Sequence, residues 1–79
     1  MKLECKDYLM KYVIDRFGED VETTKKSDEY FTVIVEVTLS PTFYGWIFQF
    51  DGDMRILTPK KAIGEIIKMA NNLVARETL

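Results

Sequence analysis

The spacing of apolar residues changes several times along the 79-residue chain, and each change predicts a new element. A short alternation at the N-terminus predicts a strand with Leu3 and Cys5 on its buried side. Apolar residues at helical spacing then predict a helix over 7–17. Asp7 is suited to cap the start of this helix, and Gly18 is suited to end it.

The strongest signal is a strict alternation over residues 31–39, which predicts a half-buried antiparallel strand. The residues expected on its buried face are Phe31, Val33, Val35, Val37 and Leu39. A weaker alternation at 21–26, rich in threonine, predicts another strand, for which we consider an edge position. Residues 27–29 supply the turn between these two strands.

Two cap-plus-proline pairs predict how the remaining helices begin. Ser40-Pro41 predicts a short helix, which the turn at 51–53 ends before a short strand at 54–57. Thr58-Pro59 predicts the start of a last helix. The apolar stripe expected on that helix consists of Ile63, Ile66, Ile67, Ala70, Leu73 and Val74.

The resulting order, β-α-β-β-α-β with an added C-terminal helix, predicts an α+β fold of the ferredoxin-like kind. We expect a four-stranded antiparallel sheet with helices on one face, formed by a single domain over residues 1–79. An irregular α+β sandwich of similar content is the alternative. Repeats and linkers are absent from the sequence.

The composition removes several classes of chemistry. The chain has no histidine, and Cys5 is its only cysteine, so neither a histidine-based catalytic site nor an internal disulfide can form. Charge is nearly balanced, with 11 basic and 13 acidic residues, so nothing drives the whole molecule toward nucleic acid. We expect a cytoplasmic protein with no membrane segment, no enzyme activity, no cofactor and no metal.

Candidate binding residues lie on the sheet face opposite the helices. Thr24 and Lys26 of the second strand should point there, and Arg55 of the last strand should join them. Such a face can meet phosphate, another domain or a second protomer, although a plain solvated face fits the pattern equally well. It carries no stacking aromatics, so an RNA recognition motif is disfavoured.

Two further residues are candidates for the binding surface. Arg16 lies in the last turn of the first predicted helix, where it interacts favourably with the helix dipole or holds an anion. Tyr44 and Phe48 fall off the apolar stripe of the short second helix, so they would form a contact patch if exposed. We assign Phe43 and Trp46 of the same segment to the core.

Four stretches together carry a resemblance to a known family. They are 13–21 (VIDRFGEDV), 30–37 (YFTVIVEV), 41–50 (PTFYGWIFQF) and 54–59 (MRILTP). In order and spacing they resemble the C-terminal extension of WYL-domain transcriptional regulators, over nearly the whole chain. No single stretch is diagnostic by itself.

The resemblance implies a ferredoxin-like fold and a regulatory role. Regulators of this kind carry an N-terminal winged helix-turn-helix and a central WYL domain that senses a ligand, in some members an oligonucleotide. The extension helps to form dimers and contributes to the ligand site. This chain has no helix-turn-helix and no Trp-Tyr-Leu run, since Ile47 follows Trp46, so we expect a fragment of a larger regulator.

The partners expected from this reasoning are a second copy or an adjacent WYL domain. Nucleic acid would be met only through the parent protein or as a single-stranded effector. A stand-alone domain that binds small molecules is the alternative function. An acylphosphatase-type enzyme is disfavoured, because Asn71 and Asn72 are far in sequence from Arg16 and no anion-cradling loop is visible.

Overall fold

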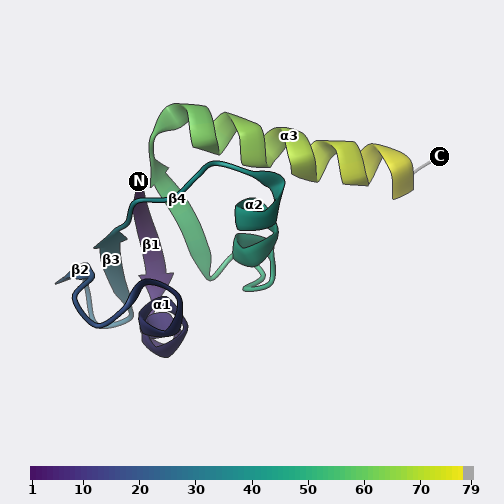
Figure 1. Cartoon of the computed structure of the whole chain (residues 1–79). Coiled ribbons are helices and arrows are strands. Elements are labelled where there is room, and N and C mark those ends of the chain that lie inside the picture. The colour runs from purple at the N-terminus through teal and green to yellow at the C-terminus, as the bar shows by residue number, and fades with distance from the viewer. Residues whose placement is uncertain (78–79) are drawn as a thin grey trace.

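The computed structural model describes residues 1–77, and residues 78–79 of the expected domain lie outside that range. The elements are β1 (Lys2–Lys6), the 3₁₀ turn η1 (Asp7–Leu9), α1 (Met10–Phe17), β2 (Glu22–Lys25), β3 (Tyr30–Ile34), α2 (Pro41–Phe48), β4 (Met54–Thr58) and α3 (Lys60–Glu77). This order confirms the predicted succession of strands and helices (Figure 1).

The four strands form one sheet in the order β2-β3-β1-β4, and every neighbouring pair is antiparallel. The first strand, β1, therefore lies inside the sheet between β3 and β4, while β2 and β4 are the edges. This order is that of the ferredoxin-like plan. The predicted α+β fold with a four-stranded antiparallel sheet is confirmed, and β2 takes the edge position considered for it.

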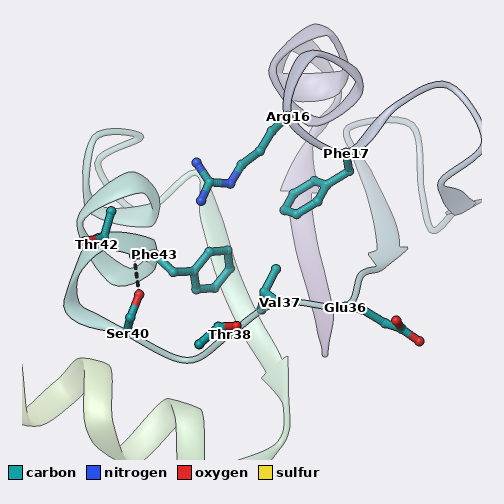
Figure 2. A pocket seen from close by; sticks show the side chains of 8 residues that line it. All are labelled: Arg16, Phe17, Glu36, Val37, Thr38, Ser40, Thr42 and Phe43. Carbon is teal, nitrogen blue, oxygen red and sulfur yellow. Dashed lines mark hydrogen bonds between the residues drawn. The ribbon is translucent and has the colours of Figure 1, made fainter.

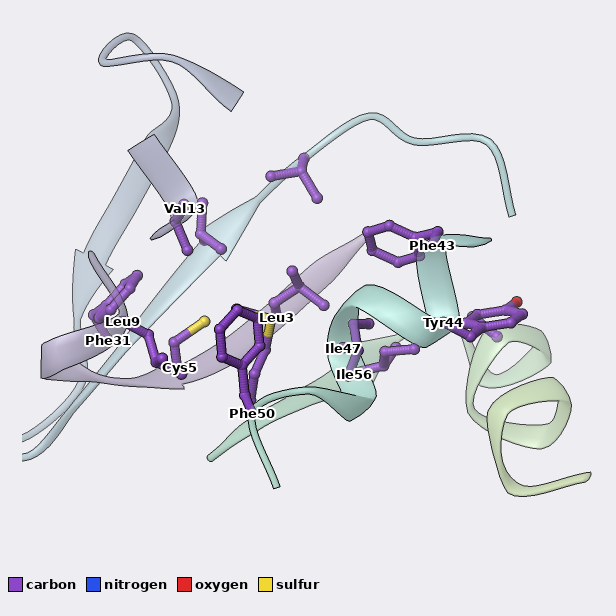
Figure 3. Close-up of a cluster of buried hydrophobic side chains, with 14 residues drawn as sticks. Leu3, Cys5, Leu9, Val13, Phe31, Phe43, Tyr44, Ile47, Phe50 and Ile56 are labelled. Carbon is purple, nitrogen blue, oxygen red and sulfur yellow. The ribbon is translucent and has the colours of Figure 1, made fainter. Parts of the chain in front are cut away.

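The core lies between one face of the sheet and the helices. Leu3 and Cys5 supply the centre of that face, and Leu9 and Val13 cover them from η1 and α1, all four fully buried. The buried apolar side chains are Leu3, Cys5, Leu9, Val13, Phe31, Val33, Val35, Phe43, Tyr44, Ile47, Phe50, Met54, Ile56 and Ala62 (Figure 3). The sheet contributes period-two positions, as the alternation predicted.

The third strand is shorter than its alternation predicted. β3 ends at Ile34, where the ladders with both β1 and β2 also end. Val35 still exchanges hydrogen bonds with Met1, since its N–H donates to the Met1 carbonyl at 2.9 Å and its carbonyl accepts from the N-terminal ammonium at 3.0 Å. Beyond that pair neither β1 nor β2 continues beside the chain, so residues 36–39 are irregular. Val37 still packs against the core.

One of the two cap-plus-proline predictions is confirmed and the other is wrong. The Ser40 hydroxyl accepts a hydrogen bond from the Phe43 N–H at 3.2 Å, and Pro41 begins α2. Thr58 instead ends β4, so it does not cap α3. The pairing of β4 with β1 extends to Thr58, and this ladder takes precedence over the local helix-start signal.

The predicted cap at Asp7 is also wrong. Asp7 is the first residue of η1, and the cap position before it is Lys6, which makes no side-chain capping bond. The Asp7 carboxylate pairs with the Lys25 ammonium of β2 instead. The Asp7 carboxylate, which the sequence predicted to cap the helix, therefore forms an ion pair with β2 instead.

The last helix carries the predicted apolar stripe, but only its first half is buried. Ala62 is fully buried and Ile63 is partly so, whereas Ile67 is 52% exposed and Leu73 is 63% exposed. Figure 1 shows α3 passing α2 and continuing away from the sheet to the C-terminal end. The outer half of α3 therefore overhangs the rest of the domain.

Tyr44 is buried, which corrects its assignment to an exposed contact patch. Its side chain is 2% exposed, and its hydroxyl donates to Glu65 Oε2 of α3 at 2.5 Å. α3 lies over this side of α2, an arrangement that the spacing within α2 does not reveal. Phe48, its predicted companion, is exposed. Burial and the hydrogen bond to Glu65 raise the pKa of Tyr44 to about 12.

Replacing Tyr44 with phenylalanine should lower the free energy of unfolding by about 1 kcal/mol, because one hydrogen bond to a carboxylate is lost while the ring stays. The folded pKa of about 12 lies above the ordinary 10.0, so the contribution is complete below pH 10 and is lost as pH rises toward 12. Urea unfolding of Tyr44→Phe and the parent chain should therefore differ at neutral pH and converge in alkaline buffer.

The matched control for that experiment is Tyr12→Phe, since Tyr12 lies on the surface and packs its ring on Phe50. This variant should leave the free energy of unfolding unchanged at neutral pH. Equal stability of Tyr44→Phe and the parent chain there would contradict the role given to the bond with Glu65.

Candidate functional site

An open groove lies between the end of α1 and the start of α2 (Figure 2). Its lining residues are Arg16, Phe17, Glu36, Val37, Thr38, Ser40, Thr42 and Phe43. Its volume of 560 Å³ falls within the range of small-molecule sites, about 300–1,000 Å³. Figure 2 shows Arg16 reaching from α1 toward the ring of Phe43, while Glu36 points away from the guanidinium.

Local sequence signals position both sides of this groove. Gly18 ends α1 with φ of 93°, and its N–H donates to the Ile14 carbonyl at 2.8 Å. A residue with a side chain rarely adopts this backbone conformation, so the glycine places Arg16 in the final turn. On the other side the Ser40 cap fixes the first turn of α2, which carries Phe43.

The Arg16 guanidinium lies over a cluster of three aromatic rings. Its central carbon is 4.9 Å from the ring centre of Trp46, 5.7 Å from that of Phe43 and 5.8 Å from that of Phe17. Trp46 also stacks with Phe43 at 6.0 Å and meets Phe17 edge-on at 5.7 Å. Cation–π contacts of this kind hold the cation without neutralising it.

The opposite face of the sheet carries a single row of polar side chains across all four strands. Thr24, Thr32, Glu4 and Arg55 are direct partners in the successive ladders. Glu4 lies at the centre of this row, and its side chain is only 9% exposed. Lys26, the residue that follows β2, pairs with Glu4 from the side opposite Arg55.

Glu4 binds both of the basic residues beside it. Arg55 Nε donates to Glu4 Oε1 at 2.8 Å, and the Lys26 ammonium donates to Oε2. The hydrogen bond from Arg55 and then that from Lys26 lower the pKa of Glu4 from its ordinary value of 4.5, against the effect of burial. The charges of Lys26 and Arg55, two of the predicted binding residues, are thus largely compensated by a carboxylate of the same face.

The structure brings together three of the five residues predicted for the binding surface. Thr24, Lys26 and Arg55 lie in one cluster around Glu4 on the open face. Arg16 lies apart from them, on the helical side of the sheet. Tyr44 belongs to neither surface, because it is buried beneath α3.

Sequence reasoning missed a second, apolar groove between α2, β4 and α3. It is lined by Ile47, Phe48, Gly52, Met54, Arg55, Ile56, Ile63, Ile66, Ile67 and Ala70. A signal for it exists, since α3 carries two apolar seams with the same 4-3-4 spacing: Ala62, Ile66, Met69 and Leu73, and beside them Ile63, Ile67, Ala70 and Val74. The first seam begins on the core, and the second borders the groove.

Other kinds of site receive no support from residues 1–77. No three acidic or cysteine side chains of this part of the chain are arranged to hold a metal ion. None of its helices is long and apolar enough to cross a membrane. Burial raises the pKa of the Cys5 thiol to about 12, so this thiol stays protonated and unreactive near neutral pH.

The strand order and the helices on one face define a small ferredoxin-like α+β domain. A profile of the WCX domain matches residues 1–74. The chain therefore belongs to the WCX family, the C-terminal extension domain associated with WYL-domain regulators, and the predicted resemblance is confirmed. Searches among curated proteins and among solved structures found no match.

Replacing Glu4 with glutamine should destabilise the domain near neutral pH by about 1 kcal/mol, because two ion pairs to a covered carboxylate are lost. The pKa of Glu4 is lowered by folding, so its contribution is present above pH 4.5 and is lost as pH falls below that value. Urea unfolding should show a difference between Glu4→Gln and the parent chain at neutral pH that disappears in acid.

Glu22→Gln is the matched control, since Glu22 lies exposed on the edge strand β2. It should leave stability unchanged across the same range of pH. A Glu4→Gln variant as stable as the parent chain at neutral pH would contradict the stabilising role given to the two ion pairs of Glu4.

Proposed function

We propose that this domain is a non-catalytic regulatory module of a bacterial DNA-binding transcriptional regulator. In this proposal it joins two copies of the regulator and contributes to sensing an effector. Membership of the WCX family supports the regulatory role. The observation that carries the assembly role is the second apolar seam of α3, which borders an apolar groove at the surface.

Large apolar side chains are exposed around this one groove. Phe48 at the end of α2 is 44% exposed, and Ile67 on α3 is 52% exposed. Leu73 extends the apolar surface along the overhanging half of α3. Contiguous apolar surface of this kind marks an interaction site in a soluble domain, whereas single exposed apolar residues need no explanation.

A second copy of α3 fits this surface by its spacing. The 4-3-4 spacing of the second seam is that of a coiled-coil interface. Over the eleven residue-to-residue steps from Ile63 to Val74 the seam runs for about 17 Å, or three helical turns. Ala70 near its middle lets a partner helix approach closely, opposite a large Ile67.

Antiparallel pairing about a two-fold axis makes the seam self-complementary. With the axis between residues 68 and 69, Ile63 faces Val74 of the other copy and Ile67 faces Ala70. Lys60 and Glu77 continue the seam at its two ends, and in this pairing they face each other with opposite charge. The overhanging half of each α3 then covers the groove of the other copy, as a closed two-fold interface requires.

We place effector sensing on the two polar surfaces, the groove at Arg16 and the open face around Glu4. Short single-stranded oligonucleotides are one class of effector to be tried against the regulator. An adjacent WYL domain is the other partner to be considered for the apolar groove. The protonated, buried thiol of Cys5 suits the cytoplasmic location that we propose for the regulator.

Replacing Ile67 with aspartate should convert a dimer of the chain into a monomer, because it places a charge in the middle of the apolar seam. Sedimentation equilibrium over a range of concentrations measures the change. Asn72→Asp is the matched control, since it adds the same charge on the opposite side of α3. It should leave the dimer intact, and circular dichroism should show both variants folded.

Charge reversal tests the antiparallel register separately. Lys60→Glu and Glu77→Lys should each weaken the dimer by placing like charges opposite each other, and the double variant should restore it. A parent chain that stays monomeric at high concentration would contradict self-assembly and favour a stand-alone domain that binds small molecules. If the Ile67→Asp variant formed a dimer as stable as that of the parent chain, the interface would not lie on this seam.

A further inference from the structure

We propose that the groove at Arg16 is a receptor for an oxyanion, a carboxylate or phosphate group bound by the edge of the guanidinium. This inference deepens the proposed function, because it names the chemistry of the effector group that the domain would recognise. The binding itself does not depend on dimer formation, so the two can fail separately.

Arg16 makes no ion pair within residues 1–77, and its guanidinium lies against three aromatic rings. The ion pairs of this part of the chain are Lys6–Asp53, Lys25–Asp7, Lys26–Glu4, Arg55–Glu4 and Lys61–Glu65. Arg16 is next to Asp15 and close in sequence to Glu19, yet within residues 1–77 its guanidinium contacts aromatic rings and pairs with neither carboxylate. Its N–H donors therefore remain available in a chain where acidic residues outnumber basic ones.

The aromatic cluster prepares Arg16 for such a ligand. An arginine loses side-chain entropy when it is held in one position, and stacking on Trp46 and Phe43 has already imposed that loss before any ligand arrives. The ring contacts occupy none of the N–H donors in a hydrogen bond to an oxygen. The edge of the guanidinium carries parallel N–H donors whose spacing matches the two oxygens of a carboxylate or phosphate.

The remaining residues of the groove suit an anion beside the guanidinium. Figure 2 shows the guanidinium above the ring of Phe43 and on the side of Thr42, whose hydroxyl lines the same groove. Thr38 contributes a second hydroxyl. The one carboxylate of the lining, Glu36, extends away from Arg16 in this view, so the space next to the guanidinium is left to the ligand.

The single tryptophan of the chain makes the site observable. Trp46 is in contact with the guanidinium, so its fluorescence should change when a bound anion neutralises the charge of Arg16. We would titrate the 79-residue chain with sodium phosphate and separately with sodium acetate, holding ionic strength constant with chloride. We expect a saturable change with a dissociation constant on the order of 10 mM, as one bidentate contact provides.

Three variants distinguish binding at Arg16 from a general salt effect. Arg16→Gln should abolish the response, and Arg16→Lys, which keeps the charge but loses the fork, should weaken binding severalfold. Arg76→Gln is the matched control, because it removes an exposed arginine near the end of α3, and it should bind as the parent chain does. Circular dichroism checks that each variant is folded.

The two titrations also separate the possible ligand groups. A response to both anions, or to either one alone, supports the site and identifies the oxyanion it accepts. No saturable response to either anion, or an equal response from Arg16→Gln, would overturn the inference. Sedimentation of the same samples would then show whether the assembly role survives that failure.

Discussion

The domain depends on β1, because the alternating side chains of this strand divide the molecule into a core and an open face. Leu3 and Cys5 point into the core, where both are fully buried. Glu4 between them points the other way and is held by Arg55 and Lys26. Since β1 also pairs with both β3 and β4, five residues near the N-terminus connect three strands of the sheet and establish both of its faces.

The two polar surfaces use positive charge in opposite ways. On the open face Glu4 accepts hydrogen bonds from Arg55 and Lys26, so these two charges stabilise the contacts of β1 with β4 and with the residue that follows β2. At the groove Arg16 is held by the aromatic rings beneath it, and no carboxylate of residues 1–77 neutralises it. A ligand for the basic groups of the open face would have to compete with Glu4, whereas Arg16 has no such competitor among residues 1–77. This difference is why the proposed oxyanion site is at Arg16.

Features that depend on neighbouring residues were predictable, and features that depend on a distant partner were not. Alternation and the Ser40 cap gave the fold class, and the last-turn position of Arg16 followed from Gly18. The end of β3 did not follow, since it is set by where two other strands stop pairing. Tyr44 was misplaced for the same reason, because only the position of α3 decides which side of α2 is covered. Glu4 could be placed on the open face, but its central role required the strand register.

The short helix α2 is shared by both proposed surfaces. Its first turn carries Phe43, which lies under Arg16, and its later turns carry Ile47 and Phe48, which line the groove beside α3. Between them Tyr44 bonds α2 to Glu65 of α3. If an anion bound at Arg16 strengthens the pairing of two α3 helices, then pairing must strengthen anion binding by the same free energy. The proposed oxyanion site is therefore linked, through α2, to the helix that is proposed to pair two copies of the regulator.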